Sequence, residues 1–202
     1  MMRSFLTAFL GTSVEFFETV AIGYAILRAG FPREAVSAIV LGQILVFIAG
    51  IFLWPLHQYI PIFWFRMTAA SLLTWMGLYW SIKSARRLYN GKRPGWVTDP
   101  LGKVGVLPDS TGAVFSIFVF LVMLKSSAVE AFEILLIIFP VGAASHDWVS
   151  IISGAMLAII LVSAGVWLLH GHLRKVPEVI LKLATGILLF AIGVSWLLEL
   201  IP

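Results

Sequence analysis

The segment SVEFFETV, at residues 13–20, places two glutamates inside an apolar stretch that is long enough to form a membrane-spanning helix. The segment SAVEAFEI, at residues 127–134, repeats the arrangement Val-Glu-x-Phe-Glu. A spacing of three residues puts both acids of a pair on one face of a helix. The sequence therefore predicts two helices that each present two carboxylates in one direction. The four acids are Glu15, Glu18, Glu130 and Glu133.

The composition around these segments is that of an integral membrane protein. Hydrophobic residues make up 60% of the chain and charged residues 12%, whereas a soluble domain is roughly half apolar and one-quarter charged. Six apolar stretches are close to the ~20 residues that a helix needs to cross a bilayer. We expect an all-α integral membrane protein with six transmembrane helices. The stretches cover approximately 5–27, 35–56, 62–82, 113–139, 148–169 and 178–200.

The two halves of the chain are related beyond the glutamates. A shift of about 115 positions also aligns His57 with His172, and the Gly-x-x-Trp at 77–80 with that at 193–196. Each half contains three predicted helices, and because three is odd, the second half must enter the membrane from the opposite side. The sequence therefore predicts two inverted three-helix repeats.

The repeats predict one membrane domain in three parts. The first repeat covers 1–82, a basic linker covers 83–112 and the second repeat covers 113–202. Lysine and arginine gather in the linker and in the two loops that would share its side of the membrane. By the positive-inside rule this side is cytoplasmic. We expect a multi-pass protein of the cell (inner) membrane with both termini outside.

Four acids in an apolar setting require compensation. A charge at the centre of a membrane helix costs about 2.5–3.5 kcal/mol on insertion scales. Protonated, hydrogen-bonded carboxyl groups would avoid this cost, and a structural ion pair with Lys125 would offset one charge. A shared cation is the third explanation. With no cysteine in the chain, carboxylate oxygens favour a hard cation such as iron, manganese, magnesium or calcium.

Several neighbouring side chains are candidates for accessory roles. Small polar residues beside the acids would let the two helices approach closely. His57 and His172 fall at equivalent positions at opposite ends of the implied pathway, where they are either gates or ordinary interfacial residues. The accessory candidates near the acids are Thr12, Lys125, Ser126 and Ser127.

The repeated, membrane-embedded Glu-x-x-Glu motifs resemble those of the oxidase-dependent iron permease family. More distantly, the duplicated architecture is similar to the lysine-exporter-like superfamily of small transporters. The resemblance implies that the four glutamates are cation ligands and that iron is a candidate cargo. Val14 and Val129 stand where the iron permease motif usually carries arginine.

We therefore expect a secondary transporter, either a permease or a proton-coupled antiporter, of a di- or trivalent metal cation. No nucleotide-binding or hydrolase motif points to an enzyme, and we expect no organic cofactor and no nucleic-acid partner. The expected partners are the lipid bilayer, the metal cation, protons and a second copy of the chain. Two alternatives stay open: an exporter of a small organic cation or amino acid, and a membrane assembly subunit that does not transport.

Overall fold

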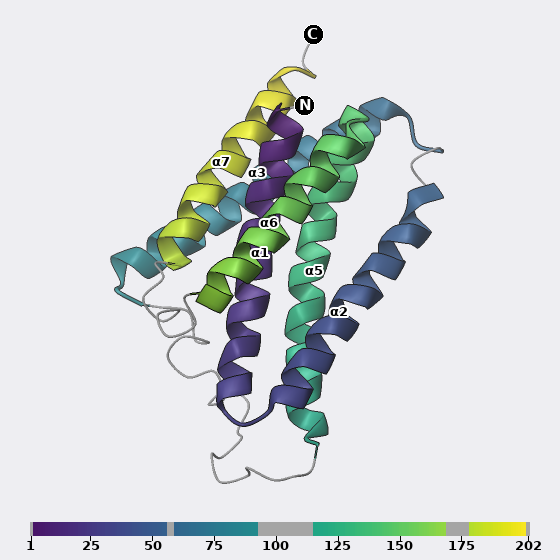
Figure 1. The fold of residues 1–202 in the computed structure, drawn as a ribbon. Helices are drawn as coiled ribbons and strands as arrows, with labels where there is room; N and C mark the ends of the chain where they lie inside the picture. The colour runs from purple at the N-terminus through teal and green to yellow at the C-terminus, as the bar shows by residue number, and fades with distance from the viewer. Residues whose placement is uncertain (1, 56–58, 93–114, 169–177, 201–202) are drawn as a thin grey trace.

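The computed structural model describes residues 2–55, 59–92, 115–168 and 178–200, which contain helices and no strand (Figure 1). Each of the six predicted segments contains one helix, so the predicted all-helical architecture is confirmed. The helices are α1 (Met2–Arg28), α2 (Pro32–Leu53), α3 (Ile62–Tyr89), α5 (Ile117–Ser145), α6 (Trp148–Leu168) and α7 (Glu178–Leu198).

Four of these helices, α1, α2, α6 and α7, are long and apolar enough to cross a membrane. The other two, α3 and α5, are longer, at 28 and 29 residues. Of these, α5 carries Lys125 and the second glutamate pair in its middle turns. Apolar side chains are exposed along α2, including Phe47 and Phe52. An apolar exterior of this kind suits contact with lipid.

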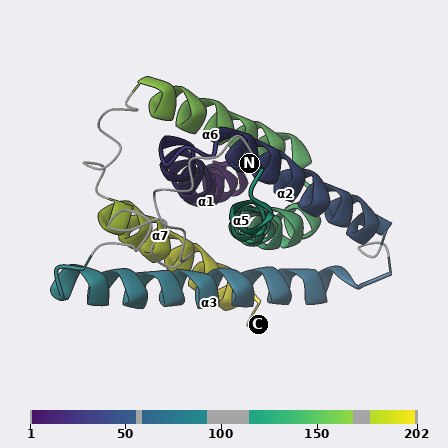
Figure 2. The same ribbon diagram turned by 90° about the horizontal axis from the view of Figure 1, so that it is seen from below.

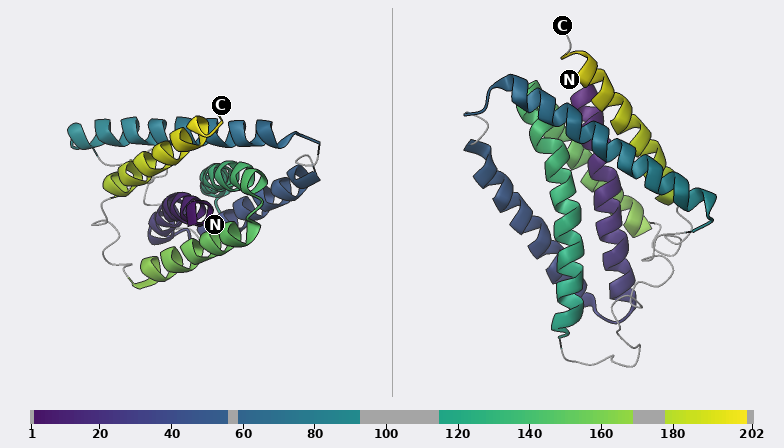
Figure 3. Two further views of the ribbon diagram at one scale, coloured as in Figure 1. Left: turned by 90° about the horizontal axis from the view of Figure 1, so that it is seen from above. Right: turned by 180° about the vertical axis from the view of Figure 1, so that it is seen from behind.

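The helices form two outer layers around a central pair. Seen from below, α1 and α5 lie between α6 and α2 on one side and α3 and α7 on the other (Figure 2). Within this arrangement α6 packs on α1, α2 packs on α5, and α3 crosses α7. The described ends of the chain lie at the same end of the bundle (Figure 3), where the Arg3 guanidinium donates to the Glu199 carboxylate at 2.7 Å.

Two helices extend at their C-terminal ends well beyond the predicted stretches. The helix α3 continues to Tyr89, so the first residues of the predicted linker are helical, and residues 93–114 lie outside the described part of the chain. The helix α5 runs through Pro140 to Ser145. Proline removes one backbone hydrogen bond and bends a helix without necessarily ending it.

The crossing of α3 and α7 is made by glycine. A Cβ atom on Gly77 would lie 2.7 Å from the carbonyl oxygen of Gly186, and one on Gly193 would lie 2.9 Å from that of Ala70. Small residues permit such backbone contact between membrane helices. The two contacts mirror each other, because a shift of 116 positions converts Gly77 into Gly193 and Ala70 into Gly186.

Substituting Gly77 by alanine should therefore destabilise the protein. Alanine normally favours a helix over glycine by about 1 kcal/mol, but here the added methyl group would overlap the backbone of α7. Gly165→Ala in α6 is a matched control, because its Cβ would meet no atom within 4 Å. We expect the melting temperature in detergent to fall for Gly77→Ala and to hold or rise for Gly165→Ala. Equal melting temperatures would show that the crossing tolerates a side chain.

Candidate cation site

The central helices α1 and α5 bring the predicted acids together. Glu15, Glu18 and Glu130 each place a carboxylate oxygen within 4.8 Å of the others. Glu133, one turn further along α5, lies outside this group of three but close enough to Glu15 to interact with it electrostatically. Two helices that are far apart in the sequence thus contribute to one cluster, which we call the acid cluster (Glu15, Glu18, Glu130 and Glu133).

Burial within the acid cluster is greatest at Glu15, whose side chain is 0% exposed. The other three acids are partly buried. Both carboxylate oxygens of Glu15 lack a hydrogen-bond partner among the described residues, as do the hydroxyl groups of Thr12 and Thr19 on the same helix. Leaving one buried polar group unpartnered costs about 1–3 kcal/mol. The hydroxyl groups of Thr12 and Thr19 and the Oε2 atom of Glu15 are therefore buried oxygens without a hydrogen bond to any described residue.

One cation reaches the acid cluster from α7. The Lys182 ammonium lies 2.8 Å from Glu18 Oε1 and 3.3 Å from Glu15 Oε1, and its side chain is only 12% exposed. The same ammonium lies 4.9 Å from the ring centroid of the buried Trp80, over its face. Aromatic faces attract cations most strongly where water is excluded. Lys182 is thus held on two sides, by carboxylates and by an indole ring.

Sequence reasoning missed Lys182 and considered Lys125 as the neutralising residue. In the structure Lys125 is exposed and makes no ion pair with a carboxylate that the structure describes. Lys125 and Glu130 are five positions apart, which places them on different faces of α5. The signal for Lys182 was present, because it is a lone charge in the apolar run VILKLATGILL at 179–189, the same feature that singled out the acids.

The accessory candidates have separate roles. Ser127 is buried and donates to the carbonyl oxygen of Ile39 at 3.2 Å, so it fastens α5 to α2. A Cβ on Gly42 would meet the same serine side chain at 2.7 Å. Ser126 is partly buried on α5. The two histidines considered as gates lie outside the described residues; they are His57 and His172.

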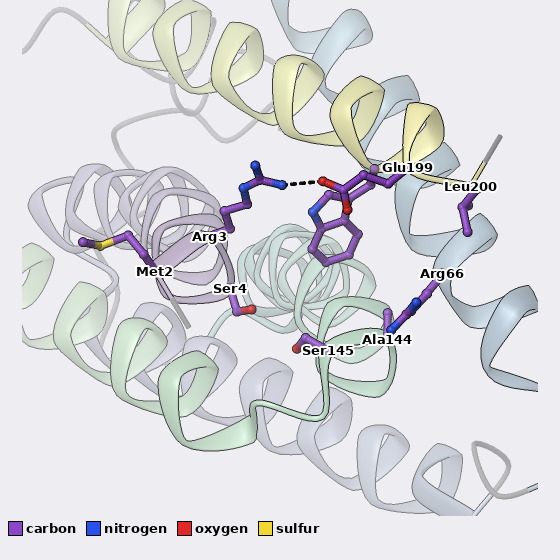
Figure 4. Close-up of a pocket in the computed structure, with 9 residues that line it drawn as sticks. Met2, Arg3, Ser4, Arg66, Ala144, Ser145, Glu199 and Leu200 are labelled. Atoms are coloured by element: carbon purple, nitrogen blue, oxygen red, sulfur yellow. Dashed lines mark hydrogen bonds and ion pairs between the residues drawn. The ribbon is translucent and has the colours of Figure 1, made fainter. Parts of the chain in front are cut away.

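Two of the cavities that the described residues form contain charged side chains of both signs. One of about 540 Å³ borders the acid cluster at Glu133 and is lined by Trp75, Tyr79, Phe132 and Lys125. The other, of about 370 Å³, lies where the described ends of the chain meet and contains none of the four acids. We call the second one the terminal cavity. Its polar side chains come from Arg3, Ser4, Arg66, Ser145 and Glu199 (Figure 4).

The chemistry of the acid cluster suits a hard cation. Carboxylate oxygens are the ligands that iron, manganese, magnesium and calcium accept, and the cluster supplies four carboxylates against one ammonium group. These residues could therefore hold a metal ion.

No protein-family model, curated protein or solved structure matches the chain, so the resemblance to iron permeases stays a prediction carried by the two Glu-x-x-Glu motifs.

Proposed function

We propose that this protein is a multi-pass secondary transporter, a permease or proton-coupled antiporter, of a di- or trivalent metal cation such as iron or manganese. The observation that carries the proposal is the acid cluster, in which the fully buried Glu15 meets two further carboxylates from both central helices, with the single ammonium of Lys182 paired to Glu15 and Glu18. Intramembrane acids are costly and commonly mark ion pathways. Residues with a purely structural role would be expected to satisfy their own oxygens.

The proposed architecture is a pair of inverted repeats in which α1, α2 and α3 correspond to α5, α6 and α7. Three observations support it. The packing of α6 on α1 has its counterpart in the packing of α2 on α5. The contacts of Gly77 and Gly193 are reciprocal. The described chain ends lie at one end of the bundle, as an even number of crossings requires. On this proposal all six helices cross the cell (inner) membrane and both termini are outside.

Within this proposal Lys182 is a tethered counter-ion. Its ammonium neutralises part of the charge of Glu15 and Glu18 when cargo is absent. A metal ion that binds the same oxygens must displace it, so cargo and lysine compete for one position. The carboxylates then remain compensated in both the empty and the loaded protein, which keeps the cost of burying them low.

The proposal is tested by metal analysis of the purified protein followed by uptake into liposomes across a panel of ions. We expect one hard cation, with Mn²⁺ as a redox-stable probe, to enter proteoliposomes faster than protein-free vesicles. Copper(I) is a control, because it prefers soft sulfur ligands and the acid cluster offers carboxylate oxygens. Uptake that is equal to that of empty vesicles for every ion would refute metal transport.

A second candidate is transport of a small organic cation. The observation that favours it is the cavity of about 540 Å³, which combines the carboxylate of Glu133 with the aromatic rings of Trp75, Tyr79 and Phe132. Aromatic faces and carboxylates together bind organic ammonium groups. If this candidate is right, tetramethylammonium should enter the proteoliposomes, or should inhibit the entry of another organic cation. It should do so at concentrations at which Mn²⁺ neither enters nor inhibits.

A further inference from the structure

Lys182 has a counterpart in the first half of the chain. The shift of 116 positions that relates Gly77 to Gly193 also relates Arg66 to Lys182. Each of these cations is the fifth residue of its helix, because α3 begins at Ile62 and α7 at Glu178.

The tryptophans that accompany these two cations are related by the same shift. Trp80 becomes Trp196. Trp80 lies against Lys182, and Trp196 lines the terminal cavity together with Arg66. Each half therefore supplies one cation and one indole ring.

The correspondence holds in packing as well as in sequence. Leu73 and Leu189 occupy equivalent positions, and both are buried in one core cluster. Ala69 and Thr185 are also equivalent, and both are buried. The two helices therefore present matching faces to the core, and Arg66 and Lys182 occupy equivalent positions at the start of these helices.

The two cations are nevertheless in different surroundings. Lys182 is almost enclosed and lies between two carboxylates of α1. Arg66 is exposed, lines the terminal cavity, and makes no ion pair with a carboxylate in the described ranges. In Figure 4 the carboxylate in the same cavity, Glu199, is joined to Arg3 instead. The cation of the second half is thus paired with the acids of the first half, whereas the cation of the first half pairs with no acid that the structure describes.

The start of α3, which carries Arg66, packs against the helix that carries the second acid pair. The rings of Phe65 and Phe139 are 6.3 Å apart, which places the start of α3 beside α5 six residues from Glu133. Six residues correspond to about 9 Å along a helix. In the described conformation Arg66 lines the terminal cavity, so α3 would have to move along α5 to bring the guanidinium to Glu133.

We propose that Arg66 is the tethered counter-ion of Glu130 and Glu133 in a second conformation, and that Arg66 and Lys182 alternate. The proposal rests on the transport function and on the inverted repeats proposed above. In the described conformation Lys182 closes the pathway over Trp80 at the end of the bundle where α3 ends and α7 begins, which we call the basic end. In the other conformation Arg66 would close the opposite end over Trp196, while Lys182 releases Glu15 and Glu18.

The test uses two reporter cysteines, each introduced alone into this cysteine-free chain. Ser84→Cys reports on the basic end, where Ser84 is buried on α3, and Ala144→Cys reports on the terminal cavity. The rate of labelling by a water-soluble maleimide is measured on the full chain in detergent. Each cation is then removed and its effect is read at the opposite end, where a local effect of the substitution cannot reach.

Arg66→Met should slow labelling at position 84, and Lys182→Met should slow labelling at position 144. Both rates should fall by about threefold or more, because removing a contact from one of two conformations shifts the population towards the other. The double variant should return both rates towards those of the parent. Arg66→Lys, which keeps a tethered cation, should label like the parent, and Arg66→Gln repeats the test with a polar neutral side chain.

A rate at position 84 that is unchanged or raised in both neutral Arg66 variants would overturn the proposal. Unfolding raises labelling at both positions and so cannot imitate the expected result. The outcome is also separable from metal transport. If the labelling rates change as expected but no ion is taken up, the alternation of Arg66 and Lys182 stands and metal transport is rejected. If Mn²⁺ is taken up but the labelling rates do not change, metal transport stands and the alternation is rejected.

Discussion

Replacing Glu15 by glutamine should lower metal uptake by at least ~10-fold, equivalent to ~1.4 kcal/mol of ion stabilisation, while the fold is retained. Glutamine keeps nearly the same volume but removes a negative charge from a side chain that is 0% exposed. Lys182 would remain paired with Glu18 at 2.8 Å, so no buried cation is left alone. The same substitution at the other three acids should also reduce uptake, because each contributes to the acid cluster.

The control for these variants is Glu199→Gln. Glu199 pairs with Arg3 at the terminal cavity and has no contact with the acid cluster. Its neutralisation removes an acid by the same chemical change, and uptake should stay at the parental rate. Uptake and melting temperature are measured together for all five variants. Normal uptake by Glu15→Gln, or losses confined to one half of the chain, would remove the case for a shared site.

Replacing Lys182 by methionine should produce the largest loss of stability. Removing one partner of a buried ion pair costs about 3–5 kcal/mol, because the remaining charge is left uncompensated. The charge in question is that of Glu15, which has no hydrogen-bond partner among the described residues. A cation that takes the place of the ammonium should restore stability. At 100 times its dissociation constant a ligand stabilises the folded protein by about 2.7 kcal/mol.

Melting temperatures of Lys182→Met are therefore compared with and without Mn²⁺. We expect a larger increase on adding Mn²⁺ than the parent shows, and we expect the double variant Lys182→Met, Glu15→Gln to recover stability without metal. Lys83→Met is a matched control, because the Lys83 ammonium lies 5.0 Å from the ring centroid of Tyr79 but the residue is exposed. If Lys182→Met and Lys83→Met have equal effects, the lysine does not compensate the acids.

The sequence predicted the helices because apolar runs of membrane length have few alternatives. It also predicted that the two acid motifs would lie together, since matching motifs in related halves imply related positions, although only Glu15, Glu18 and Glu130 bring carboxylate oxygens within 4.8 Å of one another. Lys182 was missed because the partner of a charge depends on which helices cross, and a pattern along one segment does not contain that information. Ser127 shows the same limit. Its position beside the acids indicated an accessory role, whereas its hydroxyl group bonds to α2.

The glycine crossing of α3 and α7 has a mechanical consequence. Backbone meets backbone between Ala70 and Gly77 of α3 and between Gly186 and Gly193 of α7, so the centre of this contact can act as a pivot. Arg66 and Lys182 each stand seven to eight residues from the centre of the contact on their own helix, so the two lever arms have equal length, about 11 Å. A rotation of about 20° would swing either charged end by roughly 4 Å over such an arm. The shared crossing would thereby tie the movement of one cation to that of the other.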